Sequence, residues 1–138
     1  MEQEGARVIM ARVGDSNPSL QRRTAIANRS RSDIFVSIHV NSFGKSYANG
    51  TETYYYKYQD KQLASALQRS MAQKLQLKNN GVKRARLYVL RHSKMPTALV
   101  EPAFITNPKE NRLVNSPSFR EKIADSLLVG IKRYFDKK

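Results

Sequence analysis

Two ionisable residues stand at the ends of apolar stretches, where their side chains could do chemistry. His39 closes the run 34–38 and Glu101 closes the run 95–100, and both runs are largely apolar. This pattern is typical of strands buried on both faces, as in a mostly parallel sheet covered by helices. Ligands and reacting groups in open α/β sheets collect at the carboxyl ends of such strands. We therefore expect His39 and Glu101 to meet at one edge of the sheet.

Each of these residues also has a purely structural interpretation. A histidine at a strand end is often held by hydrogen bonds and binds no ligand, and position alone favours this role for His39. A carboxylate at such a position loses solvation unless it is paired or has a task, so for Glu101 the two interpretations weigh about equally. The other histidine, His92, lies in the polar stretch 91–94, which is typical of the surface.

The residue types present limit the kind of metal site that the chain can form. It has no cysteine, which excludes disulfides, thiolate metal sites and cysteine nucleophiles. It has only two histidines, so a three-histidine site cannot come from one copy. Any metal site must therefore use His, Asp or Glu.

Length and charge bound the class of partner. The 138 residues fit a single domain, and 25 Lys and Arg against 11 Asp and Glu give a net charge of +14. Such a charge favours nucleic acid, an anionic membrane surface or an anionic cell wall, although a solvated cationic surface without a dedicated partner explains it too. No stretch is apolar enough to span a membrane, and residues 1–7 lack the apolar segment of a signal peptide.

The elements that must position His39 and Glu101 alternate between strands and helices. The expected strand at 50–58 is rich in tyrosines, whose rings could stack on bases or sugars. Because successive side chains on a strand point to opposite faces, packing in the core and at the edge is the favoured role of these tyrosines. We predict an α/β fold, a three-layer α/β/α sandwich around a mostly parallel twisted sheet, as one domain over residues 1–138. The expected elements are strands at 6–12, 33–41, 50–58 and 95–101, helices at 19–31, 60–77, 109–114 and 116–134, a helix stop at 78–81, and a basic approach at 82–86 to a strand or loop at 87–90.

Several motifs resemble one family of enzymes. The first group is Arg12 with Asp15, then Leu20, Arg23, Ala27 and Asn28, then Asp-Ile-Phe-Val-Ser-Ile-His-Val-Asn at 33–41. The second group is Gly-Thr-Glu-Thr-Tyr-Tyr at 50–55, Tyr-Val-Leu-Arg at 88–91, and Pro-Thr-Ala-Leu-Val-Glu-Pro-Ala-Phe-Ile-Thr-Asn-Pro-Lys-Glu at 96–110. In this order, and over almost the whole chain, they are similar to the zinc-dependent N-acetylmuramoyl-L-alanine amidases of the Amidase_3 family.

The resemblance implies a reaction, a cofactor and a partner. Members of the family hydrolyse the amide between N-acetylmuramic acid and the L-alanine of the peptidoglycan stem, using a zinc-activated water. His39 corresponds to a zinc ligand and Glu101 to the catalytic carboxylate that moves the proton. We expect Asn41 and Asn107, from the same motifs, to contact substrate. The expected partners are peptidoglycan and anionic wall polymers, with nucleic acid disfavoured, and the expected location is extracellular, in the cell wall or periplasm.

The sequence departs from the family pattern at its beginning. The two other zinc ligands of the family are the histidine of a Gly-His-Gly-Gly segment and a glutamate of the first helix, and neither occurs here. Glu2 and Glu4 are poor substitutes, because they lie on an untethered terminus. We therefore expect the first strand and helix of the family domain to be missing, the zinc site to be incomplete and hydrolysis to be impaired. Either a truncated amidase or a degenerate homologue fits this pattern. The second interpretation is a noncatalytic basic module that binds wall polymer or nucleic acid.

Overall fold

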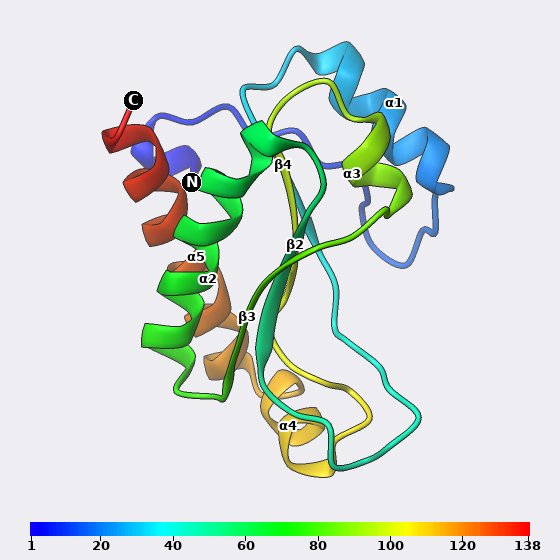
Figure 1. Ribbon diagram of the computed structural model, residues 1–138, viewed down its shortest axis with the longest axis vertical. Helices are drawn as coiled ribbons and strands as arrows, with labels where there is room; N and C mark the ends of the chain where they lie inside the picture. Colours follow the sequence, from blue (N-terminus) through cyan, green and yellow to red (C-terminus); the bar gives the residue numbers. More distant parts are fainter.

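A four-stranded sheet lies between two helical layers in the computed structural model, which describes all of residues 1–138 (Figure 1). The strand order is β1-β4-β2-β3, with β1–β4 and β2–β3 parallel and β2–β4 antiparallel. The strands are β1 Phe35–Ile38, β2 Thr51–Tyr55, β3 Asn79–Arg84 and β4 Thr97–Glu101. The predicted α/β fold class is confirmed, with a sheet that is mixed.

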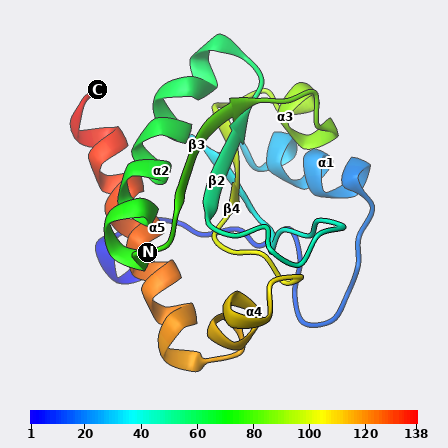
Figure 2. The same cartoon turned by 60° about the horizontal axis from the view of Figure 1, so that its bottom comes forward.

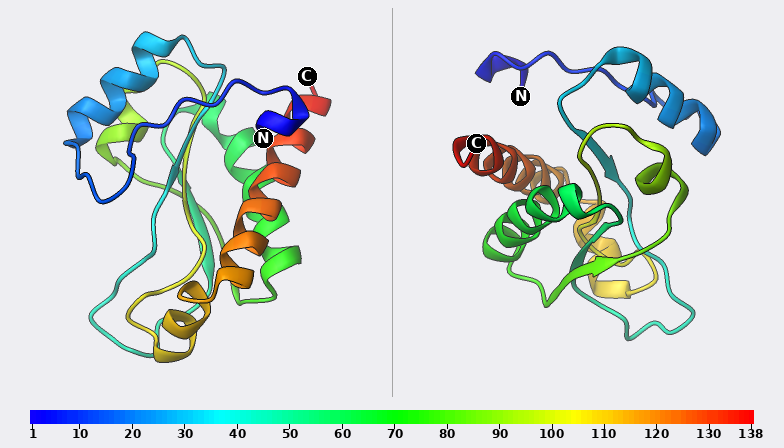
Figure 3. Two further views of the ribbon diagram at one scale, coloured as in Figure 1. Left: turned by 180° about the vertical axis from the view of Figure 1, so that it is seen from behind. Right: turned by 45° about the horizontal axis from the view of Figure 1, so that its top comes forward.

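Helices cover both faces of this sheet (Figures 1 and 3). The α-helices are α1 Leu20–Ser30, α2 Lys61–Leu75, α3 Tyr88–His92, α4 Pro108–Val114 and α5 Pro117–Asp136, and the 3-10 helices are η1 Glu2–Glu4 and η2 Tyr58–Asp60. The long helices α2 and α5 lie side by side on one face, while α1 and α3 lie on the other (Figure 3). None of the helices combines the length and the apolarity needed to cross a membrane.

The main core lies between the sheet and the pair α2 and α5. Its apolar stripe on α2 has the fourfold spacing read from the sequence, and the strand β4 contributes its alternate residues. The buried members are Leu63, Ala64, Leu67, Met71, Leu75, Ala98, Val100, Phe119, Leu127 and Tyr134. Because successive strand residues face opposite sides, Leu99 and Glu101 point to the other layer. There Leu99 packs with Val89 and Leu90 of α3.

Local signals place the helix starts. Ser19 caps α1, because its Oγ accepts a hydrogen bond from the backbone N of Arg22 at 3.1 Å. Pro117 occupies the first turn of α5, as its fixed φ and missing N–H favour. Tyr54 and Tyr56 pack against the smaller cluster around Leu99, which confirms packing as the role of these tyrosines.

Three sequence predictions are wrong. Residues 6–12 were expected to form a strand but have no regular structure, since no neighbouring strand pairs with them and their backbone lacks ladder hydrogen bonds. Residues 79–84 form the edge strand β3, which pairs in parallel with β2, and the Asn-Asn-Gly sequence is accommodated by an irregular register in which Gly81 keeps a φ of +81°. Residues 88–92 form the helix α3 in place of a strand or loop.

Candidate active site

His39 and Glu101 lie next to each other at the carboxyl ends of β1 and β4. The parallel register pairs Ile38 with Val100, and the backbone N of His39 donates to the carbonyl of Val100 at 3.0 Å. The next residue pair along these strands is therefore His39 with Glu101, on the face that carries α1 and α3. Figure 2 looks toward this end of the sheet, where the loop after β1 and the segment leading to α4 border it. The structure thus brings both predicted residues together, while their chemical roles stay predictions.

The imidazole of His39 is half-buried and favours its neutral form. Its Nε2 lies 3.1 Å from the Oγ of Ser37. Burial lowers the pKa of His39, and the nearby positive charges of Arg23 and Arg12 lower it further. A neutral imidazole keeps one ring nitrogen free of a proton, so His39 can accept a hydrogen bond or bind a metal near neutral pH.

Glu52 is the site residue that the sequence reasoning missed. The antiparallel register of β2 and β4 places Glu52 directly opposite Glu101. A carboxylate between two threonines of an expected strand was the available signal, but its partner could not be known without the strand pairing. Like charges that face each other across a ladder repel, so one of the two carboxyls must become easier to protonate.

Glu101 is the carboxyl that takes the proton. Burial raises its pKa, and the charge of Glu52 raises it further, to about 7, although the charge of Lys83 acts in the opposite direction. Its Oε2 is buried and has no hydrogen-bond partner. A carboxyl with these properties gains and loses a proton near neutral pH and has an oxygen free to bond a reacting group.

Glu52 is held as the ionised member of the pair. Its Oε1 accepts hydrogen bonds from Asn41 Nδ2 at 2.5 Å and from the Tyr54 hydroxyl at 2.6 Å, and its Oε2 accepts one from Lys83 Nζ at 2.6 Å. Burial alone would raise the pKa of Glu52, but these three donors outweigh burial and lower it. The environments of the two glutamates therefore push their pKa values apart, as in sites that divide acid and base roles.

The two asparagines singled out from the sequence make defined structural contacts. Asn41 uses its side-chain amide on Glu52 and so belongs to the carboxylate cluster. Asn107 accepts hydrogen bonds from the backbone N of Lys109 and of Glu110, both at 3.1 Å, and thereby caps the helix α4. Their contact with substrate stays a prediction.

Glu110 fixes the loops that border the site. This buried carboxylate accepts hydrogen bonds from the backbone N of Gly50, which precedes β2, and from that of Phe104, which follows β4. Both bonds are 2.8 Å long. The residues that follow Glu101 and precede Glu52 are thus tied to one side chain, which holds the two strand ends in register.

The residues of this site do not fit a complete zinc centre. Nowhere in the structure do three His, Cys, Asp or Glu side chains gather into a group that could hold a metal ion. Zinc takes at least three protein ligands, and His39 is the one imidazole at this end of the sheet. Glu4 is engaged elsewhere, because it pairs with Lys132 of α5 at 3.0 Å. His92 is exposed at the end of α3 and stacks on Tyr88, as its polar sequence context predicts.

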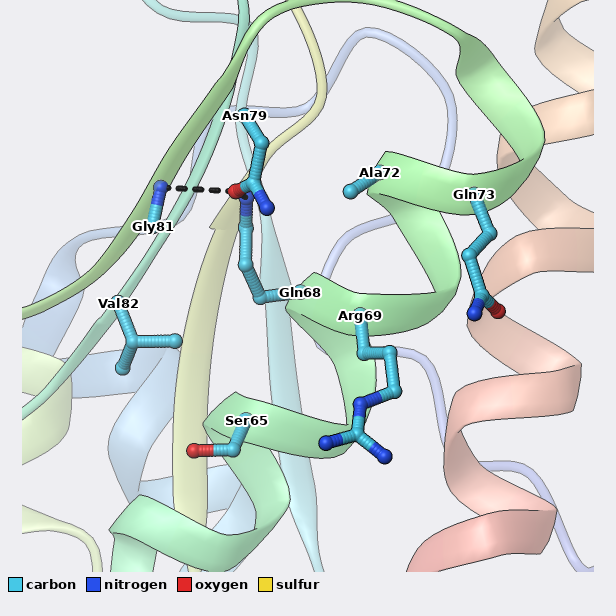
Figure 4. Close-up of a pocket in the computed structure, with 8 residues that line it drawn as sticks. All are labelled: Ser65, Gln68, Arg69, Ala72, Gln73, Asn79, Gly81 and Val82. Atoms are coloured by element: carbon cyan, nitrogen blue, oxygen red, sulfur yellow. Dashed lines mark hydrogen bonds between the residues drawn. The ribbon is translucent and has the colours of Figure 1, made fainter.

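A cavity of about 420 Å³ lies away from this site, between α2 and the edge strand β3 (Figure 4). Gln68 lines it, but the Nε2 of Gln68 already donates to Thr51 and to Asn79. Asn79 also accepts a hydrogen bond from the backbone N of Gly81 at 2.9 Å (Figure 4). These polar groups join β2, β3 and α2 to one another, and the cavity holds no ionisable pair comparable to that of the two glutamates.

Comparison with known proteins identifies the family. The chain matches the family model described as N-acetylmuramoyl-L-alanine amidase (Amidase_3) over residues 1–133, and it belongs to this family. It is 39% identical to the uncharacterized protein YqiI of Bacillus subtilis (strain 168), over 99% of this chain and 68% of that protein. It is 38% identical to N-acetylmuramoyl-L-alanine amidase LytC of the same organism, over 95% of this chain and 27% of LytC.

Solved structures agree with this assignment. N-acetylmuramoyl-L-alanine amidase AmiC2 of Nostoc punctiforme superposes with a TM-score of 0.93 at 36% identity, covering 98% of this chain and 76% of that one. The family predicted from the motifs around His39 and Glu101 is thereby confirmed. The chain spans between 25% and 65% of the length of four curated relatives other than YqiI, LytC among them.

The raised pKa of Glu101 predicts how stability depends on pH. A carboxyl whose pKa is raised on folding contributes stability that is complete below its ordinary value of 4.5 and is lost as the pH rises through about 7. Glu101→Gln cannot lose this proton. Its free energy of unfolding, measured by urea denaturation, should therefore increase relative to that of the parent chain between about pH 5 and about pH 8, so the variant gains relative stability as the pH rises.

Glu121→Gln, at an exposed position of α5, controls for the loss of one negative charge. A difference between Glu101→Gln and the parent chain that is the same at both pH values would contradict the prediction.

Proposed function

We propose that this chain acts on peptidoglycan, at the amide between N-acetylmuramic acid and L-alanine. The observation that carries the proposal is the family match over residues 1–133, which includes both strand ends of the site. LytC and AmiC2 carry this activity in their names. The relatives named as cell wall amidases support an extracellular place of action, in the wall or periplasm.

Glu101 is the proton-transfer group in this proposal. Hydrolysis of an amide requires a base that takes a proton from the attacking water and an acid that protonates the departing amine. A carboxyl with a pKa of about 7 can fill both roles in turn near neutral pH. Its unpartnered Oε2 is free to bond the water or the amine, while the hydrogen bonds to Glu52 keep the neighbouring charge in place.

Zinc is the cofactor that the family resemblance implies, and when bound it would activate water. Because residues 1–138 supply His39 without a group of further ligands, we propose that this chain holds zinc weakly and hydrolyses peptidoglycan slowly. The role of Glu101 does not depend on how the remaining ligands are provided, since its proton affinity follows from burial and from Glu52.

The second candidate function is a noncatalytic basic module that binds wall polymer or nucleic acid. The observation in its favour is the net charge of +14, of which little is compensated locally. Only Lys57, Lys83 and Lys132 form ion pairs with carboxylates. A surface with so many free cations attracts any polyanion, so attraction at low salt does not identify the partner.

Salt dependence separates recognition of the wall from general polyanion binding. We expect retention on purified peptidoglycan to persist at about 1 M salt, whereas affinity for duplex DNA should fall by roughly three orders of magnitude or more between about 0.05 and 0.2 M salt. A pull-down with insoluble peptidoglycan measures the retention, and fluorescence anisotropy measures the affinity for DNA. Parallel loss of both with rising salt would favour the basic module.

Two substitutions test the division of roles. Glu101→Gln keeps the size of the side chain and removes the proton acceptor, so it should reduce the slow release of stem peptides by roughly two orders of magnitude while retention on the wall persists. His39→Ala should lower zinc content and hydrolysis together. Chromatography of released peptides and equilibrium titration with zinc, which also detects weak binding, measure these effects.

Unchanged hydrolysis in Glu101→Gln would remove Glu101 from the mechanism. Equal loss of zinc in both variants would make Glu101 a ligand or a structural group. Stoichiometric zinc with rapid release by the parent chain would contradict the proposed impairment.

A further inference from the structure

Lys83 completes a row of charged side chains across the sheet. It lies on the edge strand β3 and pairs in register with Tyr54 of β2, on the face of the sheet that carries the two glutamates. Its Nζ is 2.6 Å from the Oε2 of Glu52. From β4 through β2 to β3, this face therefore presents Glu101, then Glu52, then Lys83.

Glu52 does not use the whole hydrogen-bonding capacity of Lys83. An ammonium group has three N–H donors, and the contact with Glu52 is the only hydrogen bond that the Lys83 ammonium makes. The side chain of Lys83 is 49% exposed, against 5% for Glu52. The remaining donors are therefore available to a molecule that lies along this face.

The neighbouring cation, Arg84, contacts Tyr56 and forms no ion pair with the two glutamates. The guanidinium of Arg84 lies 5.0 Å from the centroid of the Tyr56 ring, and its Nε donates to the Tyr56 carbonyl at 3.0 Å. Lys83 is thus the cation that pairs with a glutamate of the site, and its remaining donors are free to bind an anion.

The spacing of the strands indicates which part of a substrate Lys83 would reach. Neighbouring strands lie about 4.8 Å apart, so β4 and β3 are separated by about 10 Å, and Lys83 lies opposite Tyr54, two residues along β2 from Glu52. The side chain of Lys83 reaches back toward Glu52, which shortens this span. An extended peptide advances about 3.4 Å per residue, so a stem whose scissile amide lies at Glu101 reaches Lys83 within about two residues.

Building on the proposed function, we propose that Lys83 binds the α-carboxylate of the stem residue that follows L-alanine. In peptidoglycan this residue is D-glutamate or its amide, D-isoglutamine, and only the acid offers the α-carboxylate. A hydrogen bond between an ammonium and a carboxylate is stronger than one between an ammonium and a neutral amide. Lys83 therefore selects stems with an unamidated second residue.

Two soluble probes test this selection, namely N-acetylmuramoyl-L-alanyl-D-glutamate and N-acetylmuramoyl-L-alanyl-D-isoglutamine. Titration calorimetry with the chain should show about tenfold tighter binding of the acid. Lys83→Met should bring the ratio of the two affinities close to one, whereas Lys83→Arg should keep most of it. Lys132→Met is the matched control. Lys132 lies on α5, and like Lys83 it forms an ion pair with a glutamate, in this case Glu4. This control should keep the full ratio.

The outcomes separate this inference from the proposed function. If the parent chain binds neither probe, both fail. If it binds both probes equally, or if Lys83→Met keeps the preference for the acid, only the role of Lys83 is overturned. If Lys83→Met bound neither probe, the role of Lys83 would also be overturned, because a missing contact with a carboxylate does not explain why the amide probe no longer binds.

Discussion

The repulsion between two carboxylates that face each other across β2 and β4 is the interaction on which the site depends. The antiparallel register sets Glu52 against Glu101, and two ionised groups at this separation away from bulk water are costly. The two carboxyl groups differ in their hydrogen bonding. Glu52 receives three donors, whereas Glu101 keeps a buried oxygen without any. The proton affinity of Glu101 is thus a property of the sheet pairing as much as of its own side chain.

The scaffold fixes this pairing at both ends of β4. Before the strand, the buried carboxylate of Asp60 accepts a hydrogen bond from the backbone N of Thr97 at 3.0 Å. After the strand, Glu110 accepts one from Phe104 and also binds the residue that precedes β2. A slip of one residue would turn Glu101 toward α2 and α5, into the main apolar core. These anchors therefore preserve the chemistry as well as the fold.

Signals that act locally could be read from the sequence. The apolar runs placed His39 and Glu101 at strand ends, and the helix α1 follows from the cap at Ser19 and the spacing of its apolar residues. The motifs around these two residues were enough to predict the family. Glu52 could not be assigned, because its meaning comes from a partner almost fifty residues further along the chain. The edge strand β3 was missed for the same reason, since only pairing with β2 shows that residues 79–84 form a strand.

The central claim is that burial and the charge of Glu52 together keep Glu101 protonated up to neutral pH, and a nuclear magnetic resonance titration of ¹³C-labelled glutamate side chains tests it most directly. In the parent chain the Glu101 carboxyl should titrate at about pH 7. In Glu52→Gln it should titrate at a lower pH that is still above the ordinary value of 4.5, because the neighbouring charge is gone while burial remains. A Glu101 carboxyl that titrates at its ordinary value in the parent chain, or at the same pH in both proteins, would contradict the account.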